Sequence, residues 1–240
     1  MLENVSKPVI FTGSQLPIGD LRTDAKENLI TAIQVASLRD GNSSVLQEVA
    51  LYFEYKLYRG NRSSKINAEH FNAFASPNYP CLAESGVHLK VGNEYLLKSD
   101  KNQSLIVRTS INEDVAIIKL FPGINATIFA GILSIPGLKG VVLETYGSGN
   151  APTEKWFTDT LKDAISRGIH IVNVTQCSGG SVNMGQYETS TMLKELGVIS
   201  GKDITTEAAI TKLMYLLGQE IPHNDFKEIF ETPLRGELTK

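Results

Sequence analysis

Short apolar runs alternate with longer amphipathic segments along this chain, and the alternation restarts after a polar stretch near the middle. The apolar runs predict strands over residues 7–12, 48–53, 115–121, 140–146 and 169–175. The amphipathic segments predict helices over residues 23–38, 125–133, 154–167 and 206–217. Strands and helices that alternate at this spacing are typical of parallel βαβ units. The predicted fold class is therefore α/β, with mainly parallel sheets flanked by helices.

The first half of the chain carries three finer predictions. Leu29, Ile33 and Ala36 share one face of the first predicted helix. Residues 68–71 predict a short helical turn, and residues 82–91 predict a hairpin-like or edge segment.

The polar stretch over residues 98–113 is poor in large apolar side chains. It predicts a linker between a first domain, residues 1–97, and a second domain, residues 114–240. A chain of 240 residues is long enough for two small domains of this kind.

Composition narrows the class of protein. Hydrophobic residues make up 42% of the chain and charged residues 20%, which is typical of a folded globular protein. The net charge of −3 gives no electrostatic reason to expect a nucleic acid or a membrane as partner. The two cysteines do not suggest a disulfide framework, and the four histidines lack metal-ligand spacing, so no metal is expected. No signal peptide or membrane-spanning pattern is visible, which predicts a cytoplasmic protein.

Glycines and small hydroxyl residues follow the predicted strands. They lie in residues 12–14, 58–65, 122–124, 146–150 and 175–180. In open parallel sheets, ligands bind beyond the carboxyl ends of the strands. These segments are therefore the candidate sites for a small polar ligand.

Four residues of these segments are chemical candidates, each with a plainer interpretation. Lys65 could orient a carboxylate or accept a proton, but its spacing alone favours a solvated surface lysine. Thr12 has no base nearby in sequence and is better explained as a turn residue than as a nucleophile. Asn150 could present its amide to a ligand or simply form a turn. Cys177 has no histidine partner nearby, which favours a small, buried or ligand-contacting residue over a nucleophile.

Other chemistries find less support. Gly147-x-Gly149 lacks the third glycine of a dinucleotide fingerprint. Asp24, Glu27 and Glu54 form no recognisable carboxylate pair. The residues alone predict a two-domain α/β enzyme, but they do not define a reaction.

Several segments together resemble a known family. They are KPVIFTGSQLP, LRTDAKENL, LYRGNRSSK, YGSGNAP, TQCSGGS and LRGEL. In this order they are similar to the cytosolic (type I) bacterial L-asparaginases, and the resemblance covers essentially the whole chain. It implies hydrolysis of L-asparagine to L-aspartate and ammonia without a cofactor, by two α/β domains assembled as a homodimer or homotetramer.

The resemblance also implies roles for individual residues. Lys65 matches the catalytic lysine, and Asn150 matches a residue that binds substrate across a dimer. Thr175, Gln176 and Cys177 match part of an effector-binding site. That site's arginine is replaced here by Glu144, which cannot pair with an effector carboxylate. Activation by asparagine at that site is therefore not expected.

The family's two threonine motifs, Thr-Gly-Gly-Thr and His-Gly-Thr-Asp-Thr, do not occur in the sequence. KPVIFTGSQ matches the segment after them, so Thr12 is not the family's nucleophile. The expectation is an N-terminally truncated asparaginase with an incomplete first domain, an uncovered sheet edge and an apolar helix face. Such a chain is expected to be poorly soluble and inactive.

Two alternatives to an asparaginase stay open. One is a related amidohydrolase that acts on glutamine or on a tRNA-linked amide, although the net charge of −3 does not favour RNA binding. The other is a non-catalytic module that binds asparagine or aspartate, or that serves oligomerisation.

Overall fold

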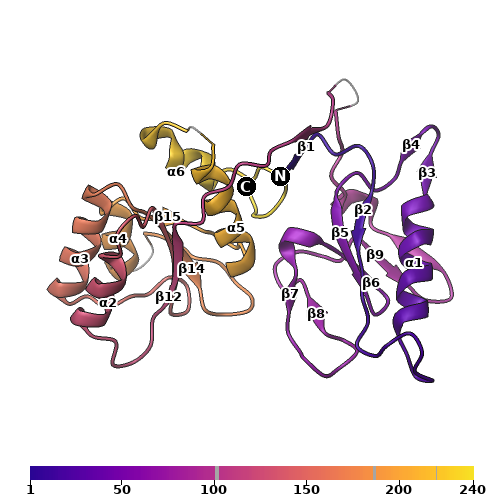
Figure 1. The fold of residues 1–240 in the computed structure, drawn as a ribbon, viewed down its shortest axis with the longest axis horizontal. Coiled ribbons are helices and arrows are strands. Elements are labelled where there is room, and N and C mark those ends of the chain that lie inside the picture. Colours follow the sequence, from indigo (N-terminus) through magenta and orange to yellow (C-terminus); the bar gives the residue numbers. More distant parts are fainter. Residues whose placement is uncertain (101–102, 186–187, 220) are drawn as a thin grey trace. The chain divides into compact units, whose positions relative to one another are not determined.

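The chain folds into two compact units, Met1–Thr109 and Ser110–Lys240 (Figure 1). The computed structural model describes residues 1–100, 103–185, 188–219 and 221–240. The boundary between the units falls inside the segment predicted as a linker, of which residues 101–102 lie outside the described residues. That segment also contributes strand β11 (Ile106–Val107), which pairs with β1 (Leu2–Glu3) inside the first unit.

The first unit is built on a five-stranded sheet. Its strand order is β10 (Leu89–Val91), β9 (Ala83–Ser85), β6 (Lys56–Arg59), β5 (Val49–Phe53) and β2 (Val9–Phe11). Only β2 and β5 are parallel in this sheet. The α/β class is confirmed, but this sheet is mixed where the sequence predicted mainly parallel pairing. The reason is a two-residue hairpin between β5 and β6, which forces those strands to run antiparallel.

Residues Glu54 and Tyr55 form that hairpin turn, with φ of +44° and +65°. Two consecutive left-handed residues match the twist of the flanking strands, as in a type I′ turn. Neither residue is the glycine or asparagine that usually announces such a turn. The backbone amide of Glu54 donates to the side-chain oxygen of Asn28 at 3.1 Å, which helps to hold this conformation.

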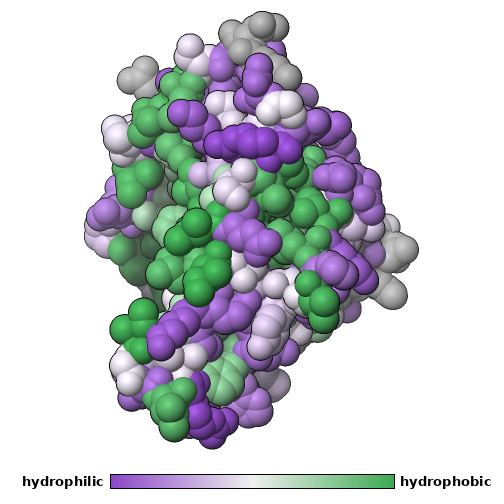
Figure 2. Space-filling model, turned by 90° about the vertical axis from the view of Figure 1, so that its right-hand side faces the viewer, coloured by the Kyte–Doolittle hydropathy of each residue, from purple (hydrophilic) through white to green (hydrophobic). Residues whose placement is uncertain are grey.

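Helix α1 (Ala25–Ser37) packs against this sheet with an unexpected face. Its buried residues are Asn28, Thr31, Ala32 and Val35. Leu29 and Ile33, predicted to share the apolar face, are 47% and 61% exposed. Figure 2 faces the side of the molecule on which α1 is drawn in Figure 1, and it shows apolar side chains gathered there. In the described part of the chain β2 pairs with β5 alone, so the sheet also ends in an open edge.

Shorter elements complete the first unit. They are β3 (Arg39–Asp40), β4 (Ser43–Ser44), the 3-10 turn η1 (Gly60–Arg62), β7 (Ser64–Lys65), β8 (Phe74–Ala75) and the 3-10 turn η2 (Asn93–Tyr95). The predicted hairpin over residues 82–91 is confirmed as β9 and β10. The predicted helical turn over residues 68–71 is wrong, because these residues form bends. The side chain of Asn67 accepts from the amides of Glu69 and His70, which stabilises a turn there instead.

The second unit is built on a parallel sheet, as predicted. Its order is β12 (Val115–Lys119), β13 (Gly140–Thr145), β14 (His170–Thr175) and β15 (Ile199–Ser200). Helices α2 (Ala126–Leu133), α3 (Lys155–Ser166) and α4 (Glu188–Glu195) pack on one face. Helices α5 (Thr206–Leu217) and α6 (His223–Glu231) pack on the other (Figure 1). Helices α4 and α6 were not predicted.

A buried ion pair ties the C-terminal segment to α5. The ammonium of Lys212 contacts the carboxylate of Glu237 and donates to the carbonyl of Thr232 at 2.7 Å. Both charged side chains are almost inaccessible, at 4% and 6% exposure. Burial raises the cost of either charge, so each depends on the other for compensation.

Removing one charge of this pair is expected to destabilise the second unit strongly. Glu237→Gln leaves the Lys212 ammonium buried without a counter-charge and should lower the free energy of unfolding by about 3 kcal/mol. Asp163→Asn is the matched control, because Asp163 pairs with Arg167 at 3.0 Å on the surface. That change should cost well under about 1 kcal/mol. Denaturant unfolding curves that shift equally for the two variants would contradict this account.

Acid is expected to destabilise the second unit through His170. Its ring stacks on Phe226 with centroids 3.7 Å apart, and burial, followed by the nearby charge of His223, lowers its pKa to about 4. The unfolded chain therefore binds more protons than the folded chain between pH 6.5 and 4, and stability falls as the pH falls through that range. The loss between pH 7 and pH 4 should be about 3 kcal/mol larger in the wild type than in His170→Phe. Unfolding curves at both pH values measure it, and equal losses would exclude His170 as the cause.

Candidate active site

Lys65 lies on the short β7–β8 hairpin of the first unit. The pairing joins Lys65 to Phe74 and Ser64 to Ala75. Its ammonium lies 5.9 Å from the centroid of the Phe74 ring, and Phe74 in turn packs on Phe53 at the end of β5. The side chain is exposed, and within the described residues its ammonium makes no hydrogen bond or ion pair. The amine is therefore available to a ligand.

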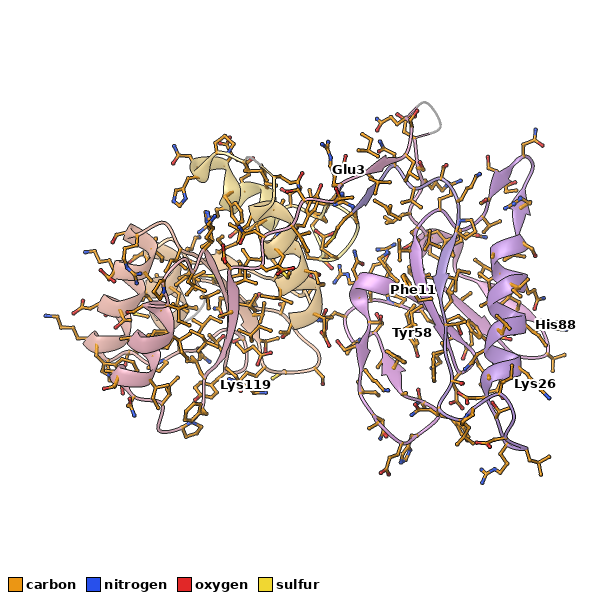
Figure 3. The ribbon with its side chains drawn as sticks, in the orientation of Figure 1. Glu3, Phe11, Lys26, Tyr58, His88 and Lys119 are labelled. Atoms are coloured by element: carbon orange, nitrogen blue, oxygen red, sulfur yellow. The ribbon has the colours of Figure 1, made fainter. Side chains whose placement is uncertain are left out.

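The segment that leads to Lys65 is fixed by buried charges. Arg59 is paired with Glu48 at 2.6 Å, and both side chains are buried. The guanidinium groups of Arg59 and Arg62 lie over the ring of Tyr79, at 4.3 and 5.2 Å from its centroid. These contacts join β6 and η1 to the rest of the unit, so Lys65 extends from a rigid base. In Figure 3, Tyr58 on β6 and Phe11 on β2 mark the five-stranded sheet to which this segment is joined.

Thr12 follows β2 and does not present a free hydroxyl. Its Oγ1 donates to the backbone carbonyl of Tyr52 at 3.0 Å. This bond joins the ends of the parallel strands β2 and β5. The interpretation of Thr12 as a structural turn residue agrees with this geometry, because the hydroxyl hydrogen is already used.

Asp24 and Asn28 organise the loop that follows Thr12. The Asp24 carboxylate accepts from the backbone amide of Gln15 at 3.0 Å and from that of Leu16 at 3.2 Å. The Asn28 side-chain amide donates to the carbonyl of Gly13 at 2.9 Å and to Asp24 at 3.2 Å. Asn28 is fully buried, so its bonds satisfy groups that water cannot reach.

Three carboxylates that looked unrelated in the sequence come together beside this loop. Burial first, and then the charges of Asp24 and Glu27, raise the pKa of Glu54. Its Oε2 is buried and has no hydrogen-bond partner among the described residues. The hydroxyl of Tyr52 donates to Glu27 at 2.8 Å, and burial together with this bond raises the pKa of Tyr52 to about 12. The sequence showed no carboxylate pair among these residues, whereas the fold brings Asp24 and Glu27 close enough for their charges to act on Glu54.

The other candidates lie in the second unit, at the carboxyl ends of β13 and β14. Thr175 donates to the carbonyl of Gly147 at 2.5 Å and accepts from the amide of Cys177 at 3.0 Å. The Gln176 side chain donates to the carbonyls of Leu120 at 2.6 Å and Glu144 at 3.0 Å. Both side chains bind the protein's own backbone, whereas Cys177 is exposed rather than buried.

Asn150 closes a compact turn that begins at Tyr146. The amide of Tyr146 donates to the carbonyl of Asn150 at 2.9 Å, and the reverse bond is 2.8 Å long. Gly147 and Gly149 have φ of +51° and +111°, a conformation that favours glycine. A Cβ at Gly149 would also lie 2.8 Å from Val182. Both glycines are therefore required by this turn.

Glu144, at the position of the expected arginine, is engaged within the unit. Its carboxylate accepts from the hydroxyl of Thr206 at 2.7 Å and lies 3.8 Å from the ammonium of Lys119 (labelled in Figure 3).

The structure thus groups Asn150, Thr175, Gln176 and Cys177 within one unit, while Lys65 belongs to the other. Sequence reasoning missed Gln15 and Asn28 and did not connect Asp24 with the loop after β2. The only available signal was the strand–turn–helix pattern around them. The described residues contain no cluster of three metal-binding side chains. Of the helices described, none is both long and apolar enough to cross a membrane.

Comparison with known families accounts for both units. The family description "Asparaginase, N-terminal" matches residues 1–96, and "Glutaminase/Asparaginase C-terminal domain" matches residues 114–230. L-asparaginase 1 of Escherichia coli (strain K12) is 44% identical over 239 residues, which cover this whole chain and 69% of the relative. The chain belongs to the asparaginase family. It is an amidohydrolase by family.

This chain is also similar to a mammalian protein and to a solved structure. The 60 kDa lysophospholipase of Mus musculus is 42% identical over this whole chain, which covers 41% of that relative. The crystal structure of L-asparaginase I from Vibrio cholerae matches with a TM-score of 0.92 and 40% identity, over this whole chain and 70% of the other. The shared fold confirms the predicted asparaginase-like architecture.

Loss of the Thr175 hydroxyl is expected to loosen the turn between Tyr146 and Asn150. Thr175→Val keeps the shape but leaves the Gly147 carbonyl and the Cys177 amide without their partner. This should lower the free energy of unfolding by about 1–2 kcal/mol and raise hydrogen exchange at the Cys177 amide. Thr175→Ser retains the hydroxyl and is the control. Equal exchange in the two variants would show that the hydroxyl does not hold this turn.

Proposed function

We propose that this chain contributes to the hydrolysis of the L-asparagine side-chain amide, giving L-aspartate and ammonia. Lys65 is its catalytic residue, because its ammonium is exposed and uncommitted on an anchored hairpin. The observation that carries the proposal is this available amine at the position that resembles the family's catalytic lysine. There a lysine holds an aspartate and tunes the proton acceptor that activates the nucleophile or water.

The nucleophilic threonine does not belong to these 240 residues. Neither threonine motif occurs in the sequence, and the Thr12 hydroxyl already donates to the carbonyl of Tyr52. The nucleophile therefore comes from a polypeptide that carries the Thr-Gly-Gly-Thr and His-Gly-Thr-Asp-Thr motifs. The exposed apolar face of α1 and the open edge of β2 support an association with further chain.

The proposal also covers the oligomeric state, the effector position and the cellular location of the protein. Asn150 binds substrate across a homodimer or homotetramer, and its fixed turn supports such a role because it holds the residue in one conformation. Thr175, Gln176 and Cys177 stand near an effector position that Glu144 makes unsuitable for a carboxylate. No cofactor takes part, and the protein acts in the cytoplasm, as the resemblance to type I enzymes implies.

A second candidate function is a non-catalytic module that binds asparagine or aspartate. The Thr12 hydroxyl already donates to the carbonyl of Tyr52, and no other threonine directly follows β2. The lack of a free threonine hydroxyl at this strand end favours binding without catalysis. Binding of asparagine with no ammonia release, even beside a polypeptide that carries both threonine motifs, would select this function.

Ammonia release from L-asparagine tests the proposal directly. The chain alone should release none above background, and co-expression with a polypeptide that carries both threonine motifs should produce activity. In that combination Lys65→Ala should lower kcat by about 100-fold or more, because a proton-transfer partner is lost.

Lys90→Ala is the matched control, since Lys90 is an exposed lysine on β10. It should leave the rate unchanged. Ammonia release by the wild-type chain alone, abolished by Lys65→Ala, would place a nucleophile within this chain and make Thr12 the first suspect. Unchanged activity of Lys65→Ala in the combination would remove Lys65 from the mechanism.

A further inference from the structure

The side chain of Gln15 bridges two distant loops of the first unit. Its Nε2 donates to the backbone carbonyls of Ala68 at 3.1 Å and His70 at 2.7 Å. Gln15 follows β2, whereas both acceptors lie in the connection between β7 and β8. That connection belongs to the hairpin that carries Lys65.

The connection between β7 and β8 has few hydrogen bonds of its own. Ile66 donates to the carbonyl of Ala73 at 2.8 Å, and Asn67 caps the turn inside the connection. Across the described chain, Gln15 provides the hydrogen bonds that reach residues 66–73 from outside the hairpin. A two-stranded hairpin alone is marginally stable in water. Phe74 anchors the strand end of this one on Phe53, so the Gln15 bonds act on the connection that this packing leaves free.

Gln15 is itself held at its backbone. Its amide lies 3.0 Å from both oxygens of Asp24, and the hydroxyl of Thr23 donates to the carbonyl of Leu16 at 3.1 Å. Asp24 also accepts from the buried Asn28, at the start of α1. A bond from an amide to a charged carboxylate is stronger than one between neutral groups, so the loop forms a stiff support.

We propose that Gln15 is a positioning residue for Lys65, and that Asp24 fixes Gln15 for this task. The inference rests on the proposed function, in which the Lys65 amine takes part in hydrolysis. Gln15 holds the connection of the hairpin, and the hairpin holds the lysine above the Phe74 ring. The loop after β2 therefore positions the hairpin that carries Lys65 and does not supply a nucleophile. A small displacement of a catalytic group costs rate without weakening substrate binding.

The test separates the tether from general stability. Gln15→Met keeps the length of the side chain but removes both donors, and Gln15→Lys restores a donor. Gln34→Met is the matched control, because Gln34 is an exposed residue of α1 whose side chain makes no hydrogen bond among the described residues. Each variant is studied in the 240-residue chain by hydrogen exchange at Ile66 and by the NMR shifts of the Lys65 methylene groups, which the Phe74 ring perturbs.

Gln15→Met should raise exchange at Ile66 about tenfold, because both hydrogen bonds to the connection are lost, and move the Lys65 shifts toward those of a free lysine. Gln15→Lys should recover both in part, and Gln34→Met should change neither. The unfolding midpoint of the unit should stay close to that of the wild type. Unchanged exchange and shifts in Gln15→Met would overturn the inference, whatever the activity.

The kinetic arm uses the combination of chains that releases ammonia. There Gln15→Met should lower kcat about tenfold with KM unchanged, since positioning and not binding is lost. A loosened hairpin with wild-type kcat would overturn the positioning role. If even the wild-type combination releases no ammonia, the proposed function fails. In that case the exchange and shift measurements still decide whether Gln15 holds the hairpin.

Discussion

The buried amide of Asn28 is the interaction on which the first unit depends. Its side chain satisfies the carbonyl of Gly13 and the amide of Glu54, and it braces the carboxylate of Asp24. These groups belong to the loop after β2, to the β5–β6 hairpin and to the start of α1. Because buried backbone groups must find partners, one side chain that serves three segments fixes their relative positions.

The need to place Asn28 beside these hydrogen-bond partners explains the orientation of α1. The helix must direct Asn28 and Thr31 toward the sheet, and its rotation then carries Leu29, Ile30 and Ile33 outward. An apolar helix face beside an open strand edge is a surface that favours association with other protein. The apolar pattern alone could not predict this orientation of α1. The pattern identifies the apolar face of the helix, but it does not show that the sheet contacts the face that carries Asn28 and Thr31.

The sequence predicted the second unit far better than the first. In the second unit β12, β13 and β14 are largely apolar runs joined by α2 and α3, so local pattern and fold agree there. The parts that were not predicted, β15, α4 and α6, lie after these strands. In the first unit the β5–β6 hairpin turns on Glu54 and Tyr55, which carry no turn signal. Lys65 and Asn150 became candidates mainly through a family resemblance. Gln15 could not be predicted at all, because its acceptors lie 53 and 55 residues away in the chain.

The strand ends of both units use their polar side chains in a similar way. Thr12, Thr175 and Gln176 all direct their donors to backbone carbonyls where strands end. Small hydroxyl and amide side chains at these strand ends therefore serve first as hydrogen-bond partners of the backbone. The polar groups that make no such bond are left for a ligand. Among the described residues of the first unit, Lys65 is one such uncommitted group, and it is a single cation. A single cation can orient an anionic group but cannot attack an amide while protonated, so the chemistry requires further residues beside it.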